Sequence, residues 1–383
     1  FGLWDGQNNS LFLVRDRYGI KPLYYYYDSE KLIFASTVKA LEKSGLVPVK
    51  KNRKAYKSFL LFGSVPFPMT TIEKVFSLQA GHYLVKNGNN HKIIKYYDIL
   101  DPFLNKSSDN FNEAVLKVKN LLEEAVRLHM VSDAPLGIFL SGGLDSSAIA
   151  SISSRTRKAP ITTLSVNFEE KNFSEKPFQD LIVGEIKSDH REIKITKEFF
   201  ENSFDEIFEA MDQPTIDGVN TFFIAKAAKR AGLKTVLSGL GSDEIFMGYP
   251  FFKRMSGLKI IQQLPGIIKN PIIFLGKKKI PKIEYLAKTD NLNFYLGIRG
   301  LFSPSETAKI LGTAQKEVEN LISEIWEAQA FNKSVSDLSA PDFISYMELN
   351  FYLKNQLLKD TDFMSMHHSI EVRVPFLDSP LVE

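Results

Sequence analysis

The sequence predicts an α/β fold in which helices connect the strands of an open parallel sheet. From about residue 112 onward, short apolar runs alternate with helical stretches, and such an order is typical of sheets that bind ligands at the carboxyl ends of their strands. Before about residue 98, β-branched and aromatic runs alternate with turn residues instead. The composition is that of a globular protein, since 44% of the 383 residues are hydrophobic.

The first hundred residues are predicted to be strand and turn. Strands are predicted at 11–14, 23–27 and 32–35, with 1–5 resembling the middle of a strand and a hairpin over 81–94 turning at Asn87-Gly88. The four tyrosines at 24–27 favour a strand packed on both faces rather than a platform for a ligand. The polar, turn-rich stretch 101–110 is interpreted as a linker.

Helices and strands are predicted to alternate after this linker. In order, we expect a helix at 112–130, strands at 136–140, 163–168, 190–196 and 235–237, helices from about 146 and over 221–231, and a mostly helical region at 255–345. The helix at 221–231 should end at Gly232, which is a good C-terminal cap.

Composition excludes several classes of protein. Cysteine is absent, so disulfides, thiolate metal sites and a cysteine nucleophile are excluded within this segment, in agreement with a reducing cytoplasm. The net charge of +3 provides no field to recruit nucleic acid or an anionic membrane. The apolar runs are too short to span a bilayer, and no signal peptide is recognisable.

A glycine-rich loop follows the strand predicted at 136–140. Its sequence, Ser-Gly-Gly-Leu-Asp-Ser-Ser at 141–147, joins an apolar strand to a helix. Two glycines let backbone amides approach an oxyanion, and the helix N-terminus directs its N–H groups to the same place. Asp145 would repel a bare phosphate, so it is interpreted as a Mg²⁺ ligand. The alternative is a plain strand-to-helix turn with a serine cap.

This loop differs from a Walker-type phosphate loop. The nearest candidate for that pattern, Gly276-Lys277-Lys278, has Pro271 where the first glycine is required. No lysine at 141–147 can lie between the β- and γ-phosphates. The loop is therefore expected to hold pyrophosphate as a leaving group while the α-phosphorus is attacked.

Two further clusters carry polar side chains. The segment 238–244, Ser-Gly-Leu-Gly-Ser-Asp-Glu, follows a predicted strand and should reach the same sheet edge. There Asp243 is a candidate second Mg²⁺ ligand, and Glu244 a candidate for positioning a substrate amine or a catalytic cation; a solvated acidic turn is the alternative. In the third cluster, 364–378, Glu371 and Arg373 share one side of an extended segment, where Arg373 meets either a bound anion or a structural ion pair.

The three clusters, in this order, resemble those of glutamine-dependent asparagine synthetases. The N-terminal segment resembles the last part of that family's N-terminal-nucleophile glutaminase domain. Further matching stretches are 4–5, 15–24, 34–36, 39–41, 62–66, 80–83, 212–214, 217–218 and 220–221. The resemblance implies a remnant of a β-rich glutaminase sandwich at 1–100, a linker at 101–110, and at 111–383 a C-terminally truncated ATP-pyrophosphatase domain of the adenine nucleotide alpha hydrolase-like fold with a helical C-terminal part.

The resemblance also implies a reaction. ATP would adenylate the side-chain carboxylate of aspartate, releasing pyrophosphate and leaving β-aspartyl-AMP, and ammonia, free or from glutamine, would displace AMP. Asp145, Asp243 and Glu244 would be catalytic, and Asp145 and Asp243 would hold Mg²⁺. The residues implied to bind the nucleotide are Phe139, Leu140, Ser141, Gly142, Gly143, Asp145, Ser146, Ser147, Val166, Ser238 and Gly239. A cytoplasmic homodimer with no nucleic-acid or membrane partner is expected.

Three departures from the family pattern bear on the substrate. The family's glutaminase nucleophile is an N-terminal cysteine, which Phe1 cannot replace, so the segment is interpreted as a fragment. Leu240 stands where many members have glutamate, and leucine cannot accept a proton. His367 stands where the common Met-Ser-Met-Ala string ends in alanine, and the pair His367-His368 is interpreted as lacking further ligands at metal spacing.

Three functions follow from these observations. The first is synthesis of asparagine. The second retains adenylation but changes the acceptor to a sugar uronic acid or to an amino acid closed to a lactam. The third is a non-catalytic paralogue, which the retained Asp145, Asp243 and Glu244 disfavour. A tRNA-modifying enzyme is disfavoured because there is no cysteine pair and little positive charge.

Overall fold

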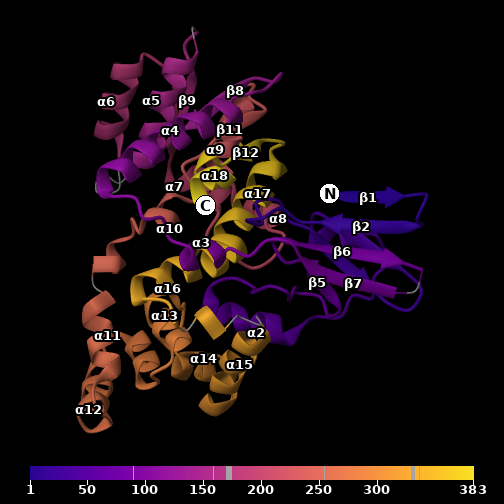
Figure 1. Cartoon of the computed structure of the whole chain (residues 1–383), viewed down its shortest axis with the longest axis vertical. Coiled ribbons are helices and arrows are strands. Elements are labelled where there is room, and N and C mark those ends of the chain that lie inside the picture. The colour runs from indigo at the N-terminus through magenta and orange to yellow at the C-terminus, as the bar shows by residue number, and fades with distance from the viewer. Residues whose placement is uncertain (89, 158, 170–174, 254, 329–332, 336) are drawn as a thin grey trace. The chain divides into compact units, whose positions relative to one another are not determined.

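The protein is described by a computed structural model covering residues 1–88, 90–157, 159–169, 175–253, 255–328, 333–335 and 337–383 (Figure 1). The chain folds into two compact units, each assembled from separate stretches of sequence. The first unit comprises Phe1–Phe103, Asp212–Ile216 and Met247–Gln356. The second comprises Leu104–Met211, Asp217–Phe246 and Leu357–Glu383. The change from the first unit to the second therefore falls within the predicted linker, but 247–356 return to the first unit.

The first unit contains two antiparallel sheets. One has the order β1-β2-β6-β7 and is formed by β1 Gly2–Asp5, β2 Ser10–Val14, β6 His82–Asn87 and β7 Asn90–Lys95. The other has the order β4-β3-β5 and is formed by β3 Tyr24–Tyr27, β4 Leu32–Ala35 and β5 Val75–Ser77. The predicted strands and the hairpin of this region are confirmed.

The tyrosine strand β3 is packed on both faces, as predicted. Tyr24 and Tyr26 lie in an apolar cluster with Val38, whereas Tyr25 lies in a separate cluster with Leu13. Alternate residues of a strand point to opposite faces, so the strand supplies both clusters at once.

Two helices interrupt the part of the chain that was predicted as strand and turn: α1 Val38–Lys43 and α2 Arg53–Phe62. That prediction was incomplete because the helix-capping residues Asn52 and Gly63, which mark the two ends of α2, were not considered. The Asn52 side chain accepts a hydrogen bond from the Ala55 amide at the start of α2, and Gly63 ends the helix with a φ of 74°.

The rest of the first unit is helical, as predicted for 255–345, although 329–332 and 336 lie outside the described residues. Its elements are α3 Asp101–Leu104, the 3₁₀ turns η2 Pro250–Lys253, η3 Pro281–Ala287 and η4 Lys333–Val335, the helices α11 Met255–Gln263, α12 Gly266–Gly276, α13 Asn291–Arg299, α14 Pro304–Leu311, α15 Gln315–Ala328 and α16 Ala340–Met347, and the π-helical stretch η5 Glu348–Leu357.

The second unit is built on a five-stranded parallel sheet with the order β10-β9-β8-β11-β12. Its strands are β8 Leu136–Phe139, β9 Thr162–Phe168, β10 Asp189–Ile195, β11 Thr235–Leu237 and β12 Glu371–Arg373. The predicted α/β class and parallel sheet are thereby confirmed. All four strands predicted for this region occur within about a residue of their expected positions.

Helices cover this parallel sheet, as they must when both faces are apolar. They are α4 Phe111–His129, α5 Leu144–Thr156, α6 Lys176–Ile186, α7 Lys197–Asn202, α8 Phe204–Ala210, α9 Val219–Arg230, α10 Ser242–Phe246, α17 Leu358–His367 and α18 Ser379–Val382, with the 3₁₀ turn η6 Pro375–Leu377. One apolar cluster joins β8 to α4 and α5, and another joins α8, α9 and α17. Figure 1 labels these helices and strands. None of the helices in the described part of the chain has the length and apolar character needed to cross a bilayer.

Candidate functional site

The glycine-rich loop lies at the carboxyl end of β8, where the sequence placed it. β8 ends at Phe139, and α5 begins at Leu144, two residues earlier than predicted. Ser141 and Leu144 are exposed, so the loop is open to a ligand. Gly142 has a φ of 90°, and a Cβ there would lie 3.1 Å from the Gln179 backbone nitrogen. Any other residue would therefore be both strained and crowded against α6.

The first turn of α5 carries no side-chain cap. Gly143 is the N-cap residue and makes no side-chain hydrogen bond to the following amides. The first amides of a helix have no partner within the helix, and most proteins satisfy them with a serine, threonine or aspartate cap. A glycine cap leaves these N–H groups without a side-chain acceptor at the positive end of a 13-residue helix. This arrangement suits an anion such as pyrophosphate.

The loop serines shape the loop from inside. The Ser141 and Ser146 hydroxyl oxygens lie 3.0 Å apart, and the Ser141 amide donates to the Ser146 hydroxyl at 3.2 Å. The Gly143 amide donates to the Ser141 hydroxyl at 3.2 Å. Ser146 is buried, with 6% of its surface exposed, whereas Ser147 is partly exposed. The buried Ser146 hydroxyl therefore stabilises the conformation of the loop through hydrogen bonds to Ser141 and Gly143.

The sequence analysis missed one residue that supports the loop. Gln179, in α6, donates from its side-chain amide to the Ser141 carbonyl at 3.2 Å and accepts from Asn167 at 3.0 Å. Both Gln179 and Asn167 are buried. A single glutamine within a helix gives no signal in the sequence, because only the packing of α6 beside the loop brings it there.

The second loop, residues 238–244, contacts the glycine-rich loop at Asp145. The Ser242 hydroxyl donates to the Asp145 carboxylate at 2.7 Å. Gly239 lies so close that a Cβ on it would be 3.0 Å from the Asp145 Cβ. Since β11 pairs with β8 in parallel, the two loops leave the same edge of the sheet. The structure therefore brings together segments almost a hundred residues apart, as the sequence predicted.

The other residues of the second loop differ in accessibility. Asp243 is partly exposed in α10, directly after Ser242, whereas Glu244 is buried with 1% of its surface exposed. The Ser238 amide donates to the Arg373 carbonyl at 2.9 Å, which fixes the start of the loop against β12. Glu244 is thus buried beneath the loop, whereas Asp243 is accessible at the surface of the loop.

The three positions expected at the adenine are distributed over two adjacent strands. Leu140 is buried, and its carbonyl accepts from the Ser165 hydroxyl at 2.5 Å. Phe139, at the end of β8, and Val166, in the neighbouring β9, are both partly exposed. Their positions at the same end of the sheet are compatible with one shared ligand, and their role at the adenine stays a prediction.

Arg373 has a structural role in this structure. Its guanidinium donates to the carbonyls of His129 and Val131 at 2.8 and 2.6 Å, at the C-terminus of α4. It also pairs with Glu371 at 3.3 Å. An arginine at the negative end of a helix satisfies carbonyls that would otherwise lack partners. Of the two roles that the sequence left open, the ion pair is the one observed.

Asp145 and Asp243 offer a donor set that fits Mg²⁺. Both are carboxylates, which are the oxygen ligands that Mg²⁺ prefers, and both are partly exposed at the loops. The absent side chain of Gly239 leaves room for the backbone directly beside Asp145. The residues present therefore fit the metal that the resemblance implied, and their role as ligands stays a prediction.

Comparison with known families agrees with this geometry. The profile of the asparagine synthase family matches residues 117–383, and that of a glutamine amidotransferase domain matches residues 1–97. The glutamine-hydrolyzing asparagine synthetase 1 of Bacillus subtilis is 27% identical over 389 residues, covering 99% of this chain and 60% of its own length. A putative glutamine-hydrolyzing asparagine synthetase of Methanocaldococcus jannaschii is 31% identical over 279 residues, covering 70% of this chain and 53% of its own.

A relative with a different name also matches. Amidase chry2 of Gibberella zeae is 27% identical over 422 residues, covering 100% of this chain and 62% of its own length. The chain thus spans about 60% of the length of such relatives. The solved structure of an NMN synthetase from Francisella tularensis aligns with 64% of this chain at 16% identity and a TM-score of 0.28, which is too low to carry a conclusion.

Proposed function

Because this chain belongs to the asparagine synthase family, we propose that it uses ATP to activate a carboxylate for amidation. The observation that carries this proposal is the glycine-capped N-terminus of α5, where Asp145 accepts a hydrogen bond from Ser242 of the second loop. A strand, an anion-binding helix terminus and a carboxylate at one sheet edge are the parts that binding of a metal-chelated triphosphate requires.

The residues of the two loops would have separate roles in binding pyrophosphate, binding the metal and positioning the reactants. Backbone amides at the start of α5 would hold the pyrophosphate portion of ATP and stabilise the charge that it gains on leaving. Asp145 and Asp243 would hold Mg²⁺, which when bound neutralises phosphate charge. The hydrogen bond from Ser242 to Asp145 fixes the orientation of that carboxylate. Glu244, buried beneath the loop, would act by positioning.

We further propose aspartate as the acceptor, with β-aspartyl-AMP as the intermediate and asparagine as the product. The names of the Bacillus and Methanocaldococcus relatives support this choice. Nitrogen would come from glutamine or ammonia, and the match of residues 1–97 to a glutamine amidotransferase domain supports glutamine. The cytoplasmic location and the homodimer are further parts of the proposal, consistent with a biosynthetic family.

Isotope exchange between pyrophosphate and ATP tests the proposal directly. With the full-length protein, Mg²⁺ and ammonia, we expect exchange that depends on added aspartate. Exchange supported by another carboxylate but not by aspartate would reject the acceptor and retain adenylation. Absence of exchange with every carboxylate tried would reject adenylation itself and favour a non-catalytic paralogue.

A specific residue favours the second candidate function, amidation of a different carboxylate such as a uronic acid or an amino acid that closes to a lactam. Leu240 stands between Gly239 and Gly241 in the second loop, where many members of the family have glutamate. It offers no group that can take up a proton from the incoming amine. The similarity to proteins named amidases is in keeping with a varied acceptor. Testing uronic acids beside aspartate in the exchange assay separates the two candidates.

A further inference from the structure

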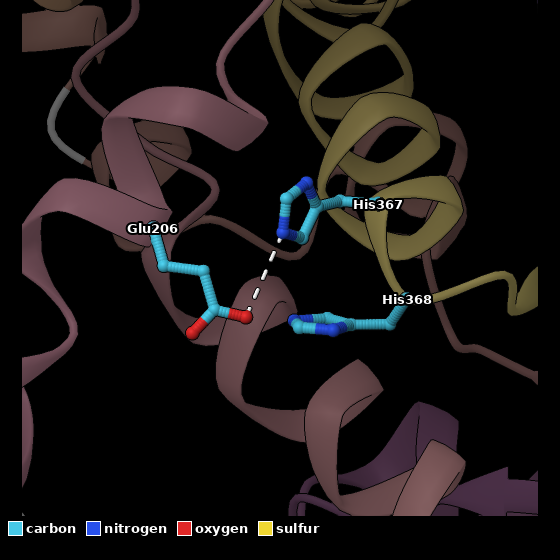
Figure 2. Close-up of side chains that lie close together, drawn as sticks. All are labelled: Glu206, His367 and His368. Carbon is cyan, nitrogen blue, oxygen red and sulfur yellow. Dashed lines mark ion pairs between the residues drawn. The ribbon is translucent and has the colours of Figure 1, made fainter.

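Three potential metal ligands that belong to neither of the two glycine-rich loops gather in the second unit. They are Glu206 in α8 and the consecutive His367 and His368, where α17 ends. One ligand atom from each lies within 4.8 Å of the others. Figure 2 shows both imidazole rings directed toward the Glu206 carboxylate. The sequence predicted no metal at the histidine pair because it revealed no third ligand, and the fold supplies one from about 160 residues away.

The two carboxylate oxygens of Glu206 have separate neighbours. One oxygen accepts a hydrogen bond from the Lys226 ammonium at 2.5 Å. The other faces Nε2 of His367 at 3.6 Å, which is longer than a direct hydrogen bond (Figure 2). Lys226 therefore orients the carboxylate through one oxygen and leaves the second directed at the imidazoles.

His368 is the buried member of the cluster. Only 2% of its surface is exposed, and its Nε2 has no hydrogen-bond partner among the residues that the structure describes. A buried polar atom without a hydrogen-bond partner is unfavourable in a folded protein, so such an atom calls for an explanation. The ring of Phe222 lies 4.6 Å from the His368 ring, centroid to centroid, and forms an apolar wall.

We propose that Glu206, His367 and His368 form a binding site for a divalent transition-metal ion of the Zn²⁺ type. Two imidazoles and one carboxylate match the ligands of three-residue Zn²⁺ sites, in which water fills the fourth position. Tetrahedral ligands at bond lengths of about 2.0–2.1 Å are about 3.3 Å apart, so the present separations of up to 4.8 Å close by at most about 1.5 Å to complete the site. Mg²⁺, which prefers oxygen ligands, fits this donor set poorly.

The bound ion would connect α8 to the end of α17. α17 leads directly into β12, and the α17 residues Phe363 and Met364 already pack in one apolar cluster with Ile207 of α8. Coordination of one ion by residues of both helices would add to the apolar packing between them. The expected consequence is greater thermal stability, since a ligand that binds only the folded chain stabilises it.

Zn²⁺ titration of the full chain after removal of metals by a chelator tests this site. Excess Mg²⁺ is kept present so that Asp145 and Asp243 do not take up the added ion. We expect one Zn²⁺ per chain, a rise in melting temperature, and visible absorption of four-coordinate Co²⁺ when cobalt replaces zinc. His367→Ala, which installs the residue common in the family, should weaken Zn²⁺ binding at least about tenfold, and so should Glu206→Gln.

A matched control separates this site from chance binding to surface histidines. His91 is exposed in β7 of the first unit, so His91→Ala removes one imidazole without touching the cluster. Zn²⁺ affinity and the cobalt spectrum should be unchanged in this variant. Equal Zn²⁺ affinity of the wild type and His367→Ala would overturn the proposal, as would failure of the wild type to bind Zn²⁺ at all. Neither result bears on pyrophosphate exchange, which is measured separately.

Discussion

At the residue scale, Asp145 is the point where the two glycine-rich loops of the second unit meet. It lies in the first turn of α5, and it accepts a hydrogen bond from Ser242 in the other loop. A carboxylate in this position is available to a metal and is already oriented. Its contribution to chemistry can therefore be separated from its contribution to folding.

Asp145→Asn is expected to reduce pyrophosphate exchange by roughly two to three orders of magnitude, because one fixed charge that supports phosphate chemistry is lost. The amide can still accept from Ser242, so the free energy of unfolding should change by less than about 1 kcal/mol. Asp133→Asn is the control. Asp133 is exposed and lies before the start of β8, the strand that leads into the glycine-rich loop. Full activity in Asp145→Asn would remove Asp145 from the metal site.

Lys354 is a buried lysine in the first unit. It is 7% exposed and donates to the Asn350 side chain at 2.7 Å. Burial lowers its pKa from 10.5 to about 7, with a further lowering by Arg15 and an opposing effect of Asp98. The unfolded chain retains this proton up to about pH 10.5, whereas the folded chain loses it near pH 7. The contribution of Lys354 to stability therefore increases as pH rises from 7 to 10.5 and is lost as pH falls through that range.

Lys354→Met should abolish this part of the pH dependence of stability. Across the whole interval the difference amounts to at most about 5 kcal/mol, and urea unfolding at pH 7 and at pH 9.5 measures most of it. Lys316→Met, at an exposed lysine of α15, is the control and should retain the wild-type slope. An unchanged slope in Lys354→Met would show that Lys354 stays charged in the folded protein up to about pH 9.5, against a lowered pKa.

At the scale of elements, one ion pair joins α13 to η5 within the first unit. Arg299, the last residue of α13, donates from Nε to the Glu348 carboxylate at 2.9 and 3.0 Å, and the Glu348 side chain is fully buried. The guanidinium also lies 3.9 Å from the ring centroid of Tyr352 and 4.3 Å from that of Tyr249. The cation is thus enclosed by a carboxylate and aromatic faces, which compensate for its removal from water.

Glu348→Ala should lower the free energy of unfolding by about 3–5 kcal/mol, because Arg299 is left with a largely buried, uncompensated charge. Chemical denaturation measures this loss. Replacing both residues, as Arg299→Met with Glu348→Leu, should recover most of the stability, since two apolar side chains of similar size need no partner. A loss below 1 kcal/mol in Glu348→Ala would mean that the aromatic rings and solvent alone accommodate the cation.

At the scale of the whole molecule, the compact units do not follow the boundary predicted from sequence. The first unit combines 1–103 with 247–356, and the contacts between these stretches are extensive. The rings of Phe62 and Phe351 are 5.1 Å apart, and the Phe67 amide donates to the Asn355 side chain at 3.0 Å. The assignment of 1–100 and 111–383 to glutaminase and synthetase domains stays a prediction about ancestry and chemistry, not about packing.

A fragment ending at residue 110 should consequently fold poorly. Phe62 and Phe67, at 9% and 6% exposure in the chain, would lose apolar neighbours contributed by later residues. We expect the fragment to bind a hydrophobic dye and to melt without a cooperative transition, whereas the full chain melts cooperatively. A cooperative transition at the melting temperature of the full chain would show that the early segment is stable by itself.

The sequence by itself determined the class of fold, the succession of strands and helices along most of the second unit and the position of the glycine-rich loop. These depend on local information: apolar runs that read as strands, the glycines at 142 and 143, and Asp145 at a fixed offset from them. A loop that joins a parallel strand to a helix must lie at the sheet edge where ligands bind, so its place follows from the order of elements alone.

Only the tertiary structure decided which distant residues meet. It placed Gln179 against the loop, Ser242 on Asp145, Arg373 on the end of α4, and Glu206 beside His367. It also returned 247–356 to the first unit. Contacts of this kind depend on how helices pack across a sheet, and a side chain far along the chain leaves no periodic signal of its partner.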